Sequence, residues 1–130
     1  MDIIAFDPFM EKATIDIQVA DQTVKVEIKT SSMDDLLVNA DFITLHVPAP
    51  ADGKAVIGNA EFAKMKNGVI IANAARGGVI DETALIANLD SGKLAHAALD
   101  VFVNEPTPRE DILKHPKISL TPHTGAATLE

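Results

Sequence analysis

From about residue 42 onward, short apolar runs rich in β-branched residues alternate with amphipathic stretches along the chain. This alternation is typical of repeated β-α units, and nearly continuous apolar runs indicate strands covered by helices on both faces. The pattern therefore predicts the α/β class with a doubly wound parallel sheet. The predicted strands are residues 42–47, 69–73, 94–101 and 118–121, and the predicted helices are residues 59–66, 81–89 and 109–114.

The first third of the chain has a different pattern. An apolar segment over residues 3–6 predicts a buried strand that ends at Asp7. Two segments, residues 14–19 and 23–28, then alternate apolar with polar side chains. They predict a hairpin with its turn near residue 20, and the alternative is a strand that crosses to the sheet edge. Ser31 or Ser32 then begins a helix that ends before Asp41.

Length, composition and charge narrow the class of protein. The chain has 130 residues, of which 47% are hydrophobic, and it contains no linker or repeat, so it suits a single globular domain. Its net charge of −8 opposes binding to nucleic acid and to anionic membrane surfaces. The absence of cysteine excludes disulfides and thiolate metal sites. No apolar run reaches the roughly 20 residues that span a bilayer, and the expected location is the cytoplasm.

Three chemically important side chains follow three successive predicted strands. Arg76 comes after the second strand, in the segment NAARGG, and an arginine there can grip a carboxylate with two parallel hydrogen bonds. Glu105 lies five residues after Asp100, which ends the next strand, and His123 follows the last strand. Parallel sheets place their ligands at the carboxyl ends of strands, so all three are expected at one rim. The alternative for Arg76 alone is a solvated surface charge.

Asp7 is the candidate for binding a dinucleotide. An acidic residue at the end of a strand can bind the ribose hydroxyls of NAD, and the alternative is an aspartate that stabilises a turn before a proline. The Gly-rich turn that holds the pyrophosphate is expected about 20 residues before such an acidic residue. That position falls before Met1, so the first strand and the Gly-rich turn are expected to be missing.

The segments NAARGGVIDETAL, LDVFVNEP and LTPHTGAAT, in this order and spacing, resemble the signature segments of the D-isomer-specific 2-hydroxyacid dehydrogenases. The likeness extends back to FITLHVP and AFDP and covers essentially the whole chain, with residues 13–30 the least typical. At the position of Glu105 the formate dehydrogenases have glutamine. At the position of Phe102 the D-lactate dehydrogenases usually have tyrosine. Within the family, the sequence as a whole is most similar to those of bacterial phosphoglycerate dehydrogenases.

This resemblance implies a Rossmann-type domain that binds NAD, and it implies roles for single residues. His123 would accept the substrate's hydroxyl proton, since histidine titrates near neutral pH. Glu105 would orient and stabilise the imidazole, and Arg76 would hold the substrate carboxylate. The other residues that the resemblance assigns to the cofactor are Val47, Pro48, Ala74, Ala75, Asp100 and Gly125.

The remaining histidines have simpler interpretations. His96 lies within a predicted strand and His115 in a connection, and neither has a second ligand at metal-binding spacing. His46 lies near the expected adenine pocket, where a cofactor contact and a packed histidine are both open. No metal site is predicted.

The resemblance also implies that the chain is part of a larger enzyme, because the substrate domain of the family is absent. The isolated chain is therefore expected to be catalytically incomplete. The competing hypothesis is a non-catalytic role, either as a folded scaffold or as a binding domain similar to the co-repressors that share this fold. A test of NAD binding separates the two.

The expected loss of the first strand has a structural consequence. In the strand order 3-2-1-4-5-6 the missing strand lies between residues 3–6 and residues 42–47, which would leave these two roughly 9.6 Å apart. Unpaired buried strand edges are costly. We therefore expect either that residues 3–6 pair directly with residues 42–47, which is the preferred version, or that a second chain, such as another copy, supplies strands to the exposed edge.

Overall fold

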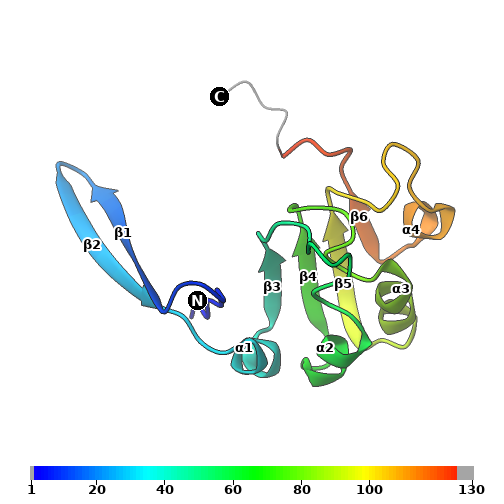
Figure 1. Cartoon of the computed structure of the whole chain (residues 1–130), viewed down its shortest axis with the longest axis horizontal. Helices are drawn as coiled ribbons and strands as arrows, with labels where there is room; N and C mark the ends of the chain where they lie inside the picture. Colours follow the sequence, from blue (N-terminus) through cyan, green and yellow to red (C-terminus); the bar gives the residue numbers. More distant parts are fainter. Residues whose placement is uncertain (1, 126–130) are drawn as a thin grey trace.

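Four parallel strands form the sheet around which residues 31–125 are arranged (Figure 1). The computed structural model describes residues 2–125. The strands are β3 (Phe42–Leu45), β4 (Val69–Asn73), β5 (Leu94–Leu99) and β6 (Ile118–Leu120), and they lie in this order across the sheet. The predicted α/β class is confirmed. The second strand has the predicted bounds, and the other three end one or two residues earlier than the sequence pattern indicated.

Four short helices connect or precede these strands. They are α1 (Met33–Asn39), α2 (Asn59–Lys64), α3 (Glu82–Asp90) and α4 (Glu110–Lys114). Ser32 caps α1 by accepting a hydrogen bond from the amide of Asp35, and Asp81 caps α3 through the amides of Thr83 and Ala84. Both caps satisfy amides that the first helical turn leaves without a partner. The helices predicted from the sequence are thus present, with ends that differ by one or two residues.

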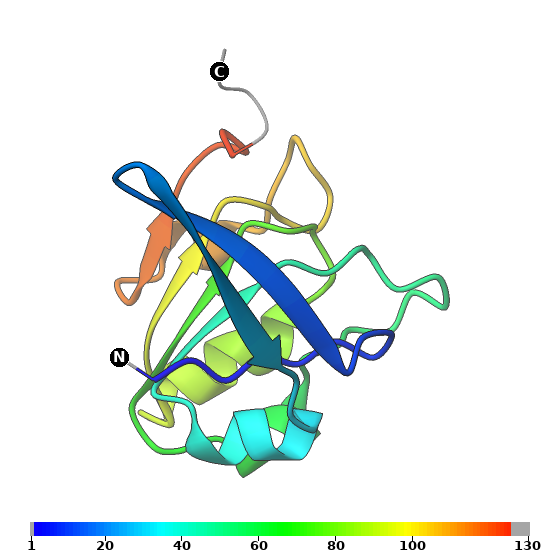
Figure 2. The same cartoon turned by 90° about the vertical axis from the view of Figure 1, so that its left-hand side faces the viewer.

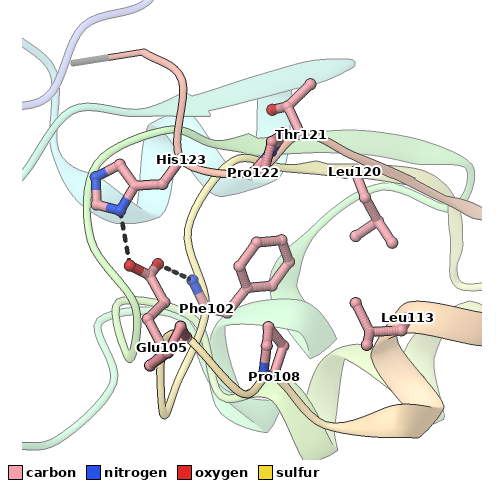
Figure 3. Close-up of a pocket in the computed structure, with 9 residues that line it drawn as sticks. Phe102, Glu105, Pro108, Leu113, Leu120, Thr121, Pro122 and His123 are labelled. Atoms are coloured by element: carbon pink, nitrogen blue, oxygen red, sulfur yellow. Dashed lines mark hydrogen bonds and ion pairs between the residues drawn. The ribbon is translucent and has the colours of Figure 1, made fainter. Parts of the chain in front are cut away.

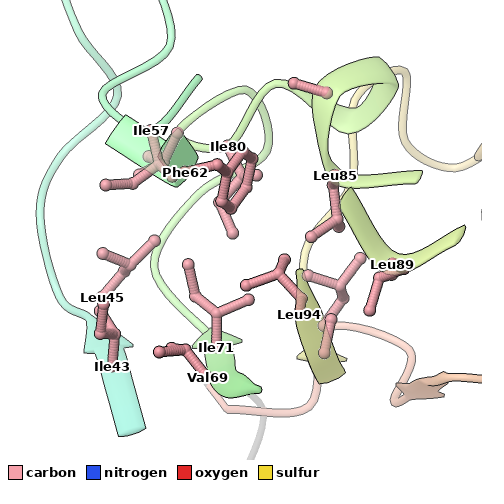
Figure 4. Close-up of a cluster of buried hydrophobic side chains, with 14 of the residues drawn as sticks. Ile43, Leu45, Ile57, Phe62, Val69, Ile71, Ile80, Leu85, Leu89 and Leu94 are labelled. Atoms are coloured by element: carbon pink, nitrogen blue, oxygen red, sulfur yellow. The ribbon is translucent and has the colours of Figure 1, made fainter. Parts of the chain in front are cut away.

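The hydrophobic core lies on one face of the sheet. In Figure 4 side chains of the strands, such as Ile71 and Leu94, extend toward Phe62 of α2 and Leu85 of α3. Burial alternates along β3 and β4, and on the opposite face Phe42 is 59% exposed. The expectation that helices cover both faces is therefore wrong for the described chain. The chain crosses the sheet in one direction from β3 to β6, and right-handed connections in one direction place every intervening helix on the same face.

Residues 12–29 form a separate antiparallel hairpin. Its strands are β1 (Lys12–Val19) and β2 (Gln22–Lys29), paired in full register. The predicted hairpin is confirmed, and the alternative of a strand crossing to the sheet edge is wrong. The hairpin contacts no other helix or strand of the described chain, and it projects away from the sheet (Figures 1 and 2). Its apolar side chains, which include Ile15 and Ile17 at 46% exposure each, are consequently open to solvent.

The predicted strand at residues 3–6 is not formed. The segment makes one isolated parallel bridge, between Ala5 and Thr30, and the carbonyl of Ala5 accepts a hydrogen bond of 2.7 Å from the amide of Ser31. The hairpin returns the chain to Thr30 beside this segment, so Ala5 pairs there with a local partner. The preferred direct pairing with β3 is therefore wrong. Among residues 2–125, the outer edge of β3 pairs with no strand.

Candidate active site

The candidate site lies at the carboxyl ends of β4, β5 and β6. Backbone pairing continues past the strands into the loops, since the amide of Asp100 donates to the carbonyl of Asn73 at 3.0 Å. The amide of Thr121 likewise donates to the carbonyl of Leu99 at 3.0 Å. The loops that follow the three strands therefore begin side by side, which brings residues far apart in the sequence to one edge of the sheet.

Glu105 and His123 form a hydrogen-bonded pair at this edge (Figure 3). Oε2 of Glu105 lies 2.7 Å from Nδ1 of His123, and Oε1 accepts a hydrogen bond of 2.8 Å from the amide of Phe102. The expected contact between carboxylate and imidazole is present. Both side chains are about one-third exposed, so solvent reaches the pair. Nε2 of His123 makes no hydrogen bond with a described residue.

The carboxylate of Glu105 is stabilised in its charged form. The hydrogen bond with His123 lowers the pKa of Glu105 below its ordinary value, and the amide of Phe102 lowers it further. Burial and the nearby charge of Asp100 oppose this change and are outweighed. Glu105 is therefore an anion at neutral pH that can stabilise a positively charged imidazole.

Asp100 holds the segment that carries His123. Its buried carboxylate accepts hydrogen bonds from the hydroxyl of Thr121 at 2.5 Å and from the amides of Thr124 and Gly125 at 2.8 Å each. Burial alone would raise the pKa of Asp100, but these hydrogen bonds outweigh it and lower the pKa to about 2. His123 lies between these anchored residues in a left-handed conformation with φ of 55°, which few side chains adopt unless held there.

The loop of Arg76 is ordered by a residue to which the sequence assigned no such role. Asn73 is buried, its Nδ2 donates to the carbonyl of Arg76, and its Oδ1 accepts from the amide of Ala75, each at 3.0 Å. A polar residue at the end of an apolar strand was the available signal. The exposed guanidinium of Arg76 donates to the carbonyl of Ala75 at 2.7 Å, and it forms no hydrogen bond or ion pair with Glu105 or His123 within the described chain.

Gly77 brings the loop of Arg76 against the loop of Glu105. A Cβ atom at this position would lie 1.9 Å from the carbonyl oxygen of Phe102, which is far inside van der Waals contact. Only glycine permits this approach of two backbones. The spacing between the two loops is therefore set by backbone contact and not by flexible side chains.

Two cavities flank the site. One, of about 230 Å³, lies over the ends of β4, β5 and β6 and includes Ala74, Asp100 and Thr121 in its lining. The other, of about 410 Å³, lies beside the Glu105–His123 pair, and apolar side chains such as Phe102 form most of its wall (Figure 3). Ala75 is buried, and the amide of Gly125 donates a hydrogen bond to Asp100, which belongs to the lining of the smaller cavity.

Several residues predicted for cofactor binding are not part of this cluster. Asp7 is exposed and accepts a hydrogen bond of 2.8 Å from the amide of Phe9. This is the geometry expected of an aspartate that stabilises a turn before a proline, which was the alternative to ribose binding. Val47 and Pro48 follow β3, beyond its last paired residue. His46 is exposed beside Thr44, where its Nε2 lies 2.9 Å from the hydroxyl oxygen.

The other histidines have structural partners. Nε2 of His96 lies 3.0 Å from the hydroxyl of Ser119, and that of His115 lies 3.3 Å from the carboxylate of Asp90. Within residues 2–125 no group of three His, Cys, Asp or Glu side chains could hold a metal ion. None of the described helices has the length and apolar character needed to cross a membrane.

The chain is an α/β protein with a parallel sheet, and its polar cluster lies at the carboxyl ends of the strands, where open sheets of this class bind their ligands. Comparison with known sequences is more specific. The family described as D-isomer specific 2-hydroxyacid dehydrogenase, NAD binding domain, matches residues 1–125. The chain belongs to this family, whose cofactor is NAD.

Individual relatives agree with this assignment. D-3-phosphoglycerate dehydrogenase of Archaeoglobus fulgidus is 41% identical over the whole chain, which spans 23% of that relative. 4-Methyl-2-oxopentanoate reductase A of Aspergillus oryzae is 46% identical over 76% of the chain, which corresponds to 30% of that protein. The crystal structure of a glyoxylate reductase from Paecilomyes thermophila superimposes with a TM-score of 0.72 at 44% identity, covering 78% of this chain and 31% of that one.

The hydrogen bonds to Asp100 predict a change of stability with pH. The pKa of Asp100 is lower in the folded protein than its ordinary value of 3.8, so its contribution is complete above that value and is lost as the pH falls toward about 2. The loss amounts to roughly 2 kcal/mol. Asp100→Asn should remove this part of the pH dependence and lower the unfolding free energy at pH 7.

Urea unfolding followed by circular dichroism between pH 2 and pH 7 measures this effect, since the chain has no Trp or Tyr for fluorescence. Asp16→Asn, at an exposed position on the hairpin, is the control and should follow the wild type. Equal pH dependence in Asp100→Asn and the wild type would contradict the prediction.

Proposed function

We propose that the chain forms the nicotinamide side of the active site in an NAD-dependent D-2-hydroxyacid dehydrogenase. The observation that carries the proposal is the hydrogen bond of 2.7 Å between Glu105 and His123 at the carboxyl edge of the sheet. Oxidation of a 2-hydroxy acid requires a base for the hydroxyl proton, and a histidine backed by a carboxylate is suited to that task.

His123 and Glu105 act as the acid–base pair in this proposal. With Nδ1 held by Glu105, Nε2 of His123 receives the hydroxyl proton of the substrate and returns it in the reverse direction. Glu105 stays ionised, because its lowered pKa keeps it charged, and it stabilises the imidazolium that forms. When bound, NAD supplies the chemistry of accepting the hydride from the substrate carbon.

Arg76 holds the substrate carboxylate. Two observations support this role: the guanidinium is exposed at the same edge of the sheet, and Gly77 packs the backbone of its loop against Phe102, three residues before Glu105. A guanidinium presents two parallel donors to a carboxylate, which fixes the orientation of the substrate. In the reverse reaction the same charge polarises the carbonyl oxygen.

The residues around the smaller cavity fit the nicotinamide end of the cofactor. Ala74 lines this cavity, so little side-chain volume obstructs a flat ring there, and Asp100, which also lines it, accepts a hydrogen bond from the amide of Gly125. Ala75, Arg76 and His123 complete this side of the proposed cofactor site. The adenine end is assigned to Asp7, Val47 and Pro48 on the resemblance alone, and the chain contains no Gly-x-Gly-x-x-Gly segment for the pyrophosphate.

The proposed substrate is a small D-2-hydroxy acid, and 3-phosphoglycerate is the first candidate because full-length phosphoglycerate dehydrogenases align over the entire chain. The chain spans about a quarter of the length of these relatives. We accordingly propose that the isolated chain is catalytically incomplete. The cytoplasmic location remains a prediction from the sequence.

Binding of nicotinamide ligands tests the proposal. Titration of the ¹⁵N-labelled chain with NADH, and separately with nicotinamide mononucleotide, should shift the amides of Ala74, Asp100 and Gly125 and leave those of the hairpin unchanged. Shifts that indicate even weak binding would support the proposal. The competing non-catalytic function, a folded scaffold or co-repressor-like domain, predicts no shifts with either ligand, and that result would overturn the proposed function.

Substitution of His123 tests its role in proton transfer. In a chimera where residues 1–125 replace the aligned segment of the Archaeoglobus fulgidus phosphoglycerate dehydrogenase, His123→Ala should lower turnover by about 10²- to 10⁴-fold. The melting temperature of the variant should match that of the parent chimera, which serves as the control for folding. Turnover within about threefold of the parent chimera would exclude His123 as the general acid–base, given the usual size of that effect.

A second copy of the chain is the proposed partner at the outer edge of β3. The support is the unpaired edge of a parallel strand, which can pair with another chain. Sedimentation velocity from low to high micromolar concentration should show a reversible dimer. A monomer at all concentrations would contradict this prediction. Nucleic acid is not expected as a partner, because the net charge is −8.

A further inference from the structure

Glu82 is a buried carboxylate outside the acid–base pair. It is the first residue of α3, and its side chain is only 7% exposed. Oε1 accepts a hydrogen bond of 2.8 Å from the amide of Val103, whereas the buried Oε2 has no hydrogen-bond partner in the described chain. Burying a carboxylate oxygen without a partner destabilises a protein. Stability alone therefore does not explain a glutamate at this position.

The amide that Glu82 binds belongs to the loop that carries Glu105. Val103 lies two residues before Glu105, and its neighbour Phe102 donates the amide hydrogen bond to Oε1 of Glu105. Consecutive amides of one backbone segment thus bind two different carboxylates. The Phe102 amide orients Glu105, and the Val103 amide fastens the same segment to helix α3.

The first turn of α3 also holds the far end of this loop. Arg109 donates a hydrogen bond of 2.7 Å to the hydroxyl of Thr83, the residue that follows Glu82 in the helix. On the other side of the loop, the carbonyl of Phe102 packs against Gly77. The segment from Phe102 to Arg109 is consequently restrained at both ends, and Glu82 holds it two residues before Glu105.

We propose that Glu82 is a positioning residue that fixes the backbone at Val103 so that Glu105 meets His123 in hydrogen-bonding geometry. The functional meaning of this inference rests on the proposed roles of Glu105 and His123. The physical effect itself does not require catalysis, because the contact between the two side chains exists in the chain without substrate.

Two substitutions of Glu82 and one control variant isolate the effect of its carboxylate. Glu82→Met fills a similar volume but has no oxygen to accept the Val103 amide. Glu82→Gln keeps an acceptor oxygen at the same reach. The matched control is Glu61→Met, since Glu61 also lies in the first turn of a helix and binds a backbone amide, that of Gly58, in a part of the fold that does not carry Glu105.

Two NMR measurements on the intact chain report the effect. In the wild type the pKa of Glu105 lies below its ordinary value, and in Glu82→Met the side-chain carboxyl carbon should titrate closer to that value. Hydrogen exchange of the Val103 amide should accelerate by about ten- to a hundredfold, the factor for one hydrogen bond to a charged group. Glu82→Gln should restore wild-type titration, and Glu61→Met should not alter it.

The proposal is overturned if Glu82→Met leaves the titration of Glu105 unchanged, or if Glu61→Met shifts it equally. If Glu82→Met does not fold, Glu82→Asp decides instead, because it retains the charge but is one methylene too short to reach Val103. An unchanged Glu105 titration in Glu82→Asp also overturns the proposal. Neither measurement involves cofactor or substrate, so failure here is distinguishable from failure of the proposed dehydrogenase function.

Discussion

The hydrogen-bond pairing of parallel strands is the constraint on which the candidate site depends. Parallel pairing of β4, β5 and β6 brings their carboxyl ends to one edge, and the pairing continues through the amides of Asp100 and Thr121 after the strands end. The following loops therefore start in register with one another. This backbone arrangement brings Glu105 and His123, which are 18 residues apart in the sequence, within hydrogen-bonding distance.

Two carboxylates near one histidine have different tasks, and their surroundings explain the division. Asp100 is buried and surrounded by donors from Thr121, Thr124 and Gly125, so it serves to hold the backbone on both sides of His123. Glu105 is more exposed and has one oxygen directed at the imidazole. Both stay ionised because each accepts hydrogen bonds that favour the charged form. Asp100 thus holds the segment that carries the imidazole of His123, and Glu105 binds the imidazole itself.

The covered face of the sheet follows from the direction of the chain. Every step from β3 to β6 moves the same way across the sheet, so right-handed connections place the helices together and leave residues such as Phe42 exposed. A doubly wound sheet covers its second face with helices from strands beyond the point where the direction reverses. The described strands supply one direction only, which accounts for the open face and for the unpaired edge of β3.

The sequence by itself determined the α/β class, the positions of the four sheet strands, the start of the first helix at Ser31 or Ser32, and the candidate pair Glu105 and His123. These features depend on local periodicity, capping chemistry or the rule that ligands bind at the carboxyl ends of parallel strands. Only the tertiary structure decided that residues 3–6 bond with Thr30 and Ser31 and not with β3, because the choice between competing backbone partners depends on where the hairpin returns the chain. It also assigned backbone anchors to Asn73 and Glu82, since contacts between loops distant in sequence leave no periodic signal.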